Sequence, residues 1–238
     1  MKFLKGKSDL VDERLWIPIE EMDNEIKVLT NKLFDDVFDK INCNFKRNSN
    51  IAFFSLCTKT RPYYKSYKWK RLINDFKEKF KYPLDFIVSS NGGIIPKKYW
   101  ESYPFLSYDA HGDKNTDELY KEKLEIRLLK FLSRHNYPYV IADFRPNQRN
   151  RVVFESVLYK LKKEGKIKDF FVSPSIETFE KMCKEKRVYN YKGYSSVSSM
   201  YPTFHPYSYV ELMEKIKDFV NNCKEDDYHN LNKEGELF

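Results

Sequence analysis

The stretch that decides the fold is Ile51–Arg71, with the sequence IAFFSLCTKTRPYYKSYKWKR. Its first residues form an apolar run of strand length, which ends at Thr58. A polar loop with Pro62 follows, and Ser66 is a suitable N-cap residue for a helix over residues 66–81. A strand, a loop and a helix in this order place the loop at the carboxyl edge of a sheet, where ligands bind in open α/β folds.

The rest of the chain repeats this alternation. Apolar runs predict further strands at residues 84–90, 137–143 and 168–173, and helical periodicity predicts the helices around them. We therefore expect an α/β fold, a three-layer sandwich with a central, mostly parallel four-stranded sheet, preceded by one N-terminal helix over residues 18–42. The expected organisation is an N-terminal helical extension (1–49), an α/β domain (50–223) that includes a Ser- and Tyr-rich loop at 187–206 and a last helix at 207–222, and a mobile acidic tail (224–238).

Charge and cysteine usage narrow the class of protein. The net charge is +8, and the four cysteines form no C-x-x-C pair, so we expect a reducing compartment. No stretch has the length and apolarity of a bilayer span or a signal-peptide core, so we expect a cytoplasmic protein without a membrane partner. His111 and His205 have no partner at metal-ligand spacing, and the glycine-rich nucleotide motifs are absent, so we expect no metal and no cofactor.

Basic residues concentrate in the segment 59–81. It holds nine basic side chains against two acidic ones, with six aromatic residues among them. Because basic groups neutralise phosphates and aromatic faces stack on bases, the segment predicts RNA or another single-stranded nucleic acid as partner. The alternative is a solvated helix face whose aromatic residues lie in the core. The predicted nucleic-acid-binding residues are Lys65, Lys68, Lys70, Arg71, Arg145 and Arg149.

The carboxyl ends of parallel strands meet at one edge of a sheet. Cys57, Asn91 and Asp143 each stand at or just after such an end. The turn Asn91-Gly92-Gly93 can present backbone N–H groups to an anion or a base edge, although a tight strand-to-helix turn also needs glycine. Asp143 is a candidate base or ligand-orienting carboxylate, with a salt-bridged loop acid as the alternative.

The loop after the first strand carries a spaced motif, Leu56-Cys57-x-x-x-Arg61-Pro62-Tyr63-x-x-Ser66-x-x-Trp69. It resembles the motif of the archaeosine synthase family, which is Pro-Cys, three residues, Lys-Pro-Tyr, two residues, Ser, two residues, His. Leu56, Arg61 and Trp69 depart from this motif, and Trp69 removes one candidate acid–base residue. A second block, VSSNGGIIPKKYWESYPFLSYD at 88–109, is similar to the family's strand, glycine turn and Tyr-Asp segment, so the likeness covers roughly residues 50–145.

The resemblance implies a uracil-DNA-glycosylase-like domain in a protein that modifies a deazaguanine base of tRNA. In archaeosine synthase the nitrile of 7-cyano-7-deazaguanine in tRNA receives the side-chain amine of lysine. The family also carries a transglycosylase-like region and an RNA-binding PUA domain, for which this chain is too short. The resemblance therefore implies a stand-alone version that works with a transglycosylase-like or PUA-containing partner protein.

The resemblance also implies roles for named residues. A Cys57 thiolate, favoured by Lys59 and Arg61, would add to the nitrile while Asp109 or Asp143 moves protons. The alternative for Cys57 is a small buried hydrophobe. The candidate catalytic residues are thus Cys57, Asp109 and Asp143, and the candidate substrate-binding residues are Lys59, Arg61, Tyr63, Ser66, Ser90, Asn91, Gly92 and Gly93.

Two other functions stay open at this point. One is a non-catalytic RNA-binding module that uses the segment 59–81. The other is a glycosylase-like enzyme acting on DNA, suggested by the implied fold and by the late segment His205-Pro206-Tyr207-Ser208.

Overall fold

The computed structural model describes residues 6–108, 110, 112–185, 203 and 205–235. Its strands are β1 (Ile51–Leu56), β2 (Asp85–Ser90), β3 (Gly93–Pro96), β4 (Tyr139–Asp143) and β5 (Asp169–Ser173). Its helices are α1 (Glu25–Thr30), α2 (Lys32–Asn44), α3 (Tyr67–Phe80), α4 (Asp117–His135), α5 (Arg149–Lys163), α6 (Ile176–Lys184) and α7 (Pro206–Gly235). Most of the expected loop at 187–206 lies outside the described residues.

The strands form one sheet in the order β3-β2-β1-β4-β5. β1 pairs in parallel with β2 and β4, β4 pairs in parallel with β5, and β3 pairs antiparallel with β2. The expected α/β fold with a mostly parallel central sheet is confirmed, but the expected number of four strands is wrong. β3 escapes the sequence pattern because it has only four residues and ends in Pro96, a residue that is typical of edge strands.

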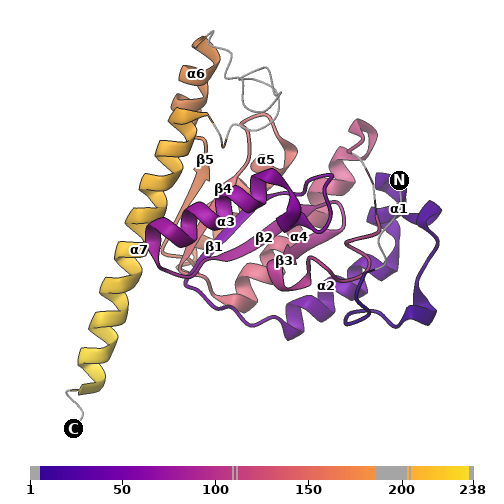
Figure 1. Ribbon diagram of the computed structural model, residues 1–238, viewed down its shortest axis with the longest axis horizontal. Coiled ribbons are helices and arrows are strands. Elements are labelled where there is room, and N and C mark those ends of the chain that lie inside the picture. Colours follow the sequence, from indigo (N-terminus) through magenta and orange to yellow (C-terminus); the bar gives the residue numbers. More distant parts are fainter. Residues whose placement is uncertain (1–5, 109, 111, 186–202, 204, 236–238) are drawn as a thin grey trace.

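Helices cover both faces of the sheet (Figure 1). On one face, the Phe53 ring of β1 contacts Trp69 and Phe76 of α3 at centroid distances of 6.1 and 5.2 Å. On the other face, the Phe54 ring contacts Phe131 of α4 and Phe154 of α5 at 6.2 and 5.1 Å. Successive residues of β1 are therefore buried against opposite helix layers, which explains why this strand is apolar on both faces.

The N-terminal segment is part of the same hydrophobic core. α2 packs against β3 and α4, and Phe34, Val37 and Ile41 are at most 1% exposed. The expected continuous helix over residues 18–42 is wrong, because Asn24 and Asn31 cap two separate helices, α1 and α2. Each asparagine oxygen accepts a hydrogen bond from a backbone N–H of the first turn, which favours a new helix start over continuation.

The last helix extends beyond its expected end. The sequence pattern predicts a helix to residue 222 and then a mobile tail, whereas α7 continues to Gly235. Near its start, Tyr209 donates a hydrogen bond to Asp75 of α3 at 2.6 Å. Further along, the Phe219 ring lies 5.0 Å from the ring of Tyr139 in β4. α7 thus shares the α3 face of the sheet and runs past its edge (Figure 1).

Candidate functional site

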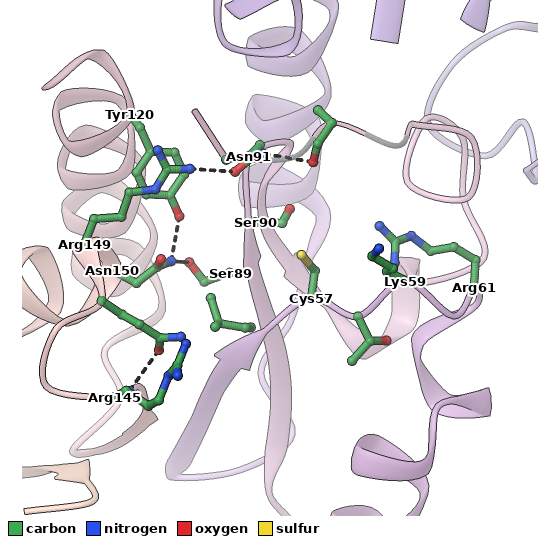
Figure 2. A pocket seen from close by; sticks show the side chains of 15 residues that line it. Cys57, Lys59, Arg61, Ser89, Ser90, Asn91, Tyr120, Arg145, Arg149 and Asn150 are labelled. Carbon is green, nitrogen blue, oxygen red and sulfur yellow. Dashed lines mark hydrogen bonds between the residues drawn. The ribbon is translucent and has the colours of Figure 1, made fainter. Parts of the chain in front are cut away.

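A cavity of about 510 Å³ lies at the carboxyl ends of β1, β2 and β4 (Figure 2). The chain leaves β1 for β2 on one side and leaves β4 for β5 on the other, so the strand order has a topological switch point between β1 and β4. In open α/β sheets, ligands bind in the crevice outside such a point. Residues that follow β1, end β2 and follow β4 all line the cavity, which places it at this crevice.

The cavity lining is cationic and polar. Four of the described lining residues are basic and none is acidic. The lining consists of Leu56, Cys57, Thr58, Lys59, Arg61, Ser89, Ser90, Asn91, Ala110, Gly112, Tyr120, Arg145, Gln148, Arg149 and Asn150. The volume is within the range of pockets that take cofactors and other small molecules, and the charge favours an anionic ligand.

Cys57 directly follows β1, and its sulfur lies among the cavity side chains (Figure 2). Burial raises the pKa of the Cys57 thiol, and the positive charges of Arg61, Lys68 and Arg149 oppose this effect only in part. Arg61 therefore favours the thiolate as expected, but burial outweighs its charge, and the thiol is neutral near pH 7.

The motif residues after Cys57 have two different roles. Arg61 lines the cavity, and its guanidinium carbon lies 4.4 Å from the ring centroid of Tyr63 and 5.4 Å from that of Tyr108. The Tyr63 and Tyr108 hydroxyl groups are 3.2 Å apart and both side chains are buried. Ser66 caps α3 by accepting a hydrogen bond from Trp69 N at 3.3 Å. Arg61 thus reaches the cavity as expected, whereas Tyr63 and Ser66 hold the loop in place outside the lining.

A buried carboxylate holds Arg149, the first residue of α5. Glu25 of α1 is 1% exposed and binds both terminal nitrogens of the Arg149 guanidinium, with Nη1 and Oε2 3.0 Å apart. Arg149 Nη1 also donates to Asp117 Oδ1 at 2.9 Å, and the guanidinium carbon lies 3.7 Å from the Tyr120 ring centroid. Arg149 is therefore a fixed, charge-paired wall of the cavity.

The side-chain amide of Asn91 is held at both ends. Its Oδ1 accepts a hydrogen bond from Arg149 Nη2 at 3.4 Å, and its Nδ2 donates to Ala110 O at 3.1 Å (Figure 2). The turn that begins at Asn91 leads into β3, so the alternative of a strand-to-helix turn is wrong. Gly93 has a φ of +130°, which favours glycine, and a Cβ at Gly92 would lie 3.2 Å from an aromatic carbon.

Several cavity residues were not predicted from the sequence, among them Ser89, Tyr120 and Asn150. Asn150 Nδ2 donates hydrogen bonds to Ser89 Oγ at 3.0 Å and to the Tyr120 hydroxyl at 2.6 Å (Figure 2). Burial raises the pKa of the Tyr120 hydroxyl, which stays neutral and able to donate a hydrogen bond. Asn150 follows the third predicted strand, so its position after a strand end could have indicated it, whereas nothing in the local sequence marks Tyr120. Ser90 lines the cavity beside this group, as expected.

Asp143, a candidate base, lies outside the cavity lining. Its Oδ2 lies 3.0 Å from Lys68 Nζ and accepts hydrogen bonds from Ser55 Oγ at 2.8 Å and Thr203 Oγ1 at 2.7 Å. This geometry is that of the alternative interpretation, a salt-bridged acid. The Lys68 side chain is 7% exposed, so its assignment as a surface contact for nucleic acid is wrong. Asp109, the other candidate carboxylate, lies outside the described residues.

The sequence matches a known protein family. The family described as Domain of unknown function (DUF5591) matches residues 36–173, more than half of the chain. The chain belongs to this family. No curated protein matches the sequence. Among solved structures, the crystal structure of AF0587, a protein of unknown function, matches with a TM-score of 0.41 and 15% sequence identity, over 58% of this chain and 43% of that chain.

The DUF5591 match contains the whole sheet and the whole cavity lining. It begins within α2 and ends at Ser173, the last residue of β5. Glu25, which holds Arg149, and Thr203, which bonds to Asp143, lie before and after the matched residues. Two supports of the site therefore come from outside the matched segment.

The basic segment 59–81 of this DUF5591 protein divides between core and surface. Trp69 and Phe76 are at most 1% exposed, which confirms the alternative interpretation for these two aromatic residues. Tyr67 is 36% exposed and stays accessible at the start of α3. The predicted nucleic-acid contacts that lie at the surface or in the cavity lining are Lys65, Lys70, Arg71, Arg145 and Arg149.

Among the residues that the structure describes, no group of three or more His, Cys, Asp or Glu side chains is arranged to hold a metal ion. None of the described helices combines the length and apolarity needed to cross a membrane.

Proposed function

We propose that this DUF5591 protein acts on a 7-deazaguanine nucleotide of tRNA, bound in the cavity around Cys57. The observation that carries the proposal is the cavity itself, where a thiol, four basic side chains and several amide and hydroxyl groups converge on about 510 Å³. Basic groups suit the phosphates of a nucleotide, and amides and hydroxyls suit the edges of a base. The likeness of the Cys57 loop to the archaeosine synthase motif supports deazaguanine as the base.

The polar groups of the cavity differ in what they can offer a base. Arg149 and Asn91 are already bonded to each other and to neighbouring residues, so they shape the wall. Asn150 uses its Nδ2 for two hydrogen bonds, and its Oδ1 accepts none from the described residues. The Asn150 Oδ1 acceptor and the Ser90 hydroxyl are the groups we assign to the base edge, since a base taken out of a stack is recognised by such contacts.

The chemistry we propose is amine transfer to the nitrile. The Cys57 sulfur bonds to the nitrile carbon and the thiol proton passes to the nitrile nitrogen, which gives a thioimidate. A primary amine then attacks this carbon, the carbon–sulfur bond breaks, and the thiolate recovers a proton from the amine, leaving an amidine. Burial keeps the Cys57 thiol neutral, and the negative phosphates of the substrate would not help it to lose its proton. We therefore propose that the sulfur attacks the nitrile carbon while the thiol proton moves to the nitrile nitrogen.

The proposal also includes a fold class for the sheet and a partner protein. We assign the sheet to the uracil-DNA-glycosylase-like class, with β3 as an added antiparallel edge strand. We also assign a transglycosylase-like or PUA-containing partner, since the cavity provides a base site while the full reaction in the resembling family uses further regions. The segment 205–208, which suggested a DNA glycosylase, does not line the cavity. Its His205 is 5% exposed, and His205 Nε2 lies 3.5 Å from Glu185 Oε2.

The test is a binding comparison between two forms of one tRNA. One form carries 7-cyano-7-deazaguanine and the other carries guanine at the same position, and affinity is measured at low and high salt. We expect the modified tRNA to bind more tightly at both salt concentrations, because base recognition persists when phosphate contacts are screened. Equal binding that collapses in high salt would leave only an electrostatic RNA-binding module.

Two variants separate binding from chemistry. Cys57→Ser should keep the preference for the modified tRNA and abolish transfer of a labelled lysine or other primary amine. Arg145→Glu, in the cavity lining, should weaken both tRNA forms, whereas Lys160→Glu on the exposed side of α5 is the matched charge control. Retained amine transfer in Cys57→Ser would remove the covalent route while leaving the binding site in place.

A further inference from the structure

A second cavity, of about 500 Å³, lies at the other end of β2, against the later turns of α3. Its floor is apolar and aromatic, and its rim is basic. We call it the lysine groove, and it is lined by Ile73, Phe76, Lys77, Lys81, Tyr82, Pro83, Leu84, Phe86 and Lys97. None of these residues lines the cavity around Cys57, so the groove is a separate site.

The three lysines of the groove face no neutralising carboxylate among the residues that the structure describes. Lys77, Lys81 and Lys97 form no ion pair with a described carboxylate, and no acidic residue lines the groove. Burial and the charge of Lys77 lower the pKa of Lys97. Three ammonium groups gathered without a counter-charge repel one another, and a bound anion relieves this repulsion.

The aromatic floor is rigid. The Phe86 ring stacks on Phe76 with a centroid distance of 5.9 Å and an interplanar angle of 13°. It also makes an edge contact with Phe53 of β1 at 6.0 Å. Phe86 stays partly exposed in the groove, and Lys97 Nζ lies 5.9 Å from its ring centroid. A flat ring held from behind is suited to stacking with an unpaired base, and such a base would move the Lys97 ammonium from the ring toward a flanking phosphate.

An exposed face of α3 extends from the groove toward the start of the helix, which follows the loop with the cavity residues Lys59 and Arg61. Tyr67, Lys70, Asn74 and Lys77 are exposed, and residues three or four positions apart share one face of a helix. The two sites are separated by the length of β2, roughly 15–20 Å. An extended single strand can cover this span along the exposed face of α3, which carries Lys70 and Lys77.

We propose that the lysine groove binds an unpaired base of the RNA, with its flanking phosphates on Lys77 and Lys97, while another nucleotide of the same strand occupies the cavity around Cys57. The class of partner rests on the proposed function. The alternative occupant is an acidic, aromatic peptide of a protein partner. RNA is favoured because exposed Lys70 and Lys77 of α3 lie between the groove and the loop that brings Lys59 and Arg61 to the cavity.

The first test uses a single-stranded RNA of about eight nucleotides that carries one 4-thiouridine and no deazaguanine. Photo-crosslinked peptides are identified by mass spectrometry with the full chain. We expect crosslinks to Tyr82 and Phe86. Crosslinks confined to the cavity around Cys57 would overturn the proposal.

The second test measures affinity of the same RNA by fluorescence anisotropy across a salt series. Lys77→Glu/Lys97→Glu should weaken binding by at least about tenfold and reduce the slope of log K against log salt by about 1.4, the value for two lost phosphate contacts on a single strand. Lys160→Glu/Lys163→Glu makes the same charge change on exposed positions of α5 and should have a much smaller effect. Equal losses in the two double variants would overturn the proposal.

Further readouts separate the occupant and the two sites. Tyr82→Ala should weaken RNA binding about tenfold without changing the salt slope, because it removes stacking and no charge. Competition by an acidic aromatic peptide but not by RNA would overturn the proposal in favour of a protein partner. This RNA lacks deazaguanine, so it tests the groove separately from the base site. If the RNA does not bind the groove but the protein still prefers the modified tRNA, only the groove proposal is refuted. If the RNA binds the groove but the protein shows no preference for the modified tRNA, only the proposed function is refuted.

Discussion

Lys68 of α3 and Asp143 at the end of β4 form a buried ion pair, with Nζ and Oδ2 3.0 Å apart and side chains 7% and 1% exposed. Ser55 Oγ and Thr203 Oγ1 complete the hydrogen bonding of the same carboxylate oxygen. The pair joins the α3 layer to the sheet at the switch point between β1 and β4. A carboxylate bound in this way supports the sheet edge, and its charge is already balanced by the lysine.

Lys68→Met should destabilise the protein by about 3–5 kcal/mol, because it leaves the Asp143 carboxylate buried without a counter-charge. The double variant Lys68→Met/Asp143→Leu should recover much of this loss. Urea denaturation measures both. The matched control is Lys162→Met, which breaks the half-exposed Lys162–Asp169 pair and should cost less than about 1 kcal/mol. A loss in Lys68→Met no larger than in this control would contradict the structural role of the buried pair.

Glu25→Gln should loosen Arg149 and lower the free energy of unfolding by about 2 kcal/mol, since Arg149 keeps Asp117 as a remaining partner. The preference for the modified tRNA over the unmodified tRNA should also become smaller, because Arg149 then no longer fixes Asn91. Asp117→Asn is the control, and its half-exposed carboxylate should contribute less than about 1 kcal/mol. Calorimetry and tRNA binding give the two readouts. If Asp117→Asn proved the more damaging change, Glu25 would not be the residue that positions Arg149.

Cys57 should react slowly with iodoacetamide at neutral pH, and its rate should keep rising above pH 9, because burial raises the pKa of its thiol and only the thiolate reacts. The exposed Cys183 in the same chain is the internal reference, and we expect Cys57 to react at least about threefold more slowly at pH 8. Arg61→Gln should slow Cys57 further, since the Arg61 charge lowers the pKa of this thiol. Peptide mass spectrometry follows each cysteine. Faster alkylation of Cys57 than of Cys183 at pH 7 would show an activated thiolate instead.

His135 should make stability depend on pH between about 6.5 and 4. Burial, with the charges of Arg134 and Arg47, lowers the pKa of His135 to about 4, against about 6.5 in the unfolded chain. The unfolded state therefore binds the proton first as pH falls, so the free energy of unfolding decreases across this window. Because the ring keeps some contact with solvent, we expect a loss of about 2 kcal/mol and not the full value of the shift.

The variant His135→Phe isolates this effect, because it keeps a ring against Phe45 and Phe131 and removes the titrating group. Denaturation at pH 7 and pH 4.5 compares the two proteins, so the titration of carboxylates cancels in the difference. The variant should lose less stability than the wild type on acidification. Parallel pH curves for the two proteins would mean that His135 is free to take up a proton in the folded state.

Local sequence was sufficient for the strand, loop and helix at Ile51–Arg71. The apolar run of β1, the N-cap at Ser66 and the position of the loop at the carboxyl edge all follow from interactions between near neighbours in the chain. The same reasoning gave the parallel strands β2, β4 and β5, and it brought Cys57, Ser90 and Asn91 to one edge. It failed for β3, whose four residues are too few to show a period.

Charge and burial of single side chains depended on partners far away in the chain. Lys68 has the sequence context of an exposed helix lysine, yet tertiary packing buries it against Asp143. Arg149 and Glu25 are 124 positions apart, and no local pattern connects them.

The sequence by itself thus determined the α/β architecture and the sheet edge at which the cavity around Cys57 lies, because periodicity and capping act over a few residues. Only the tertiary structure decided that the Cys57 thiol is neutral, that Arg149 is a fixed wall and that Lys77, Lys81 and Lys97 share a groove. The physical reason is that desolvation and ion pairing depend on the three-dimensional surroundings of a side chain, which the fold assembles from distant segments.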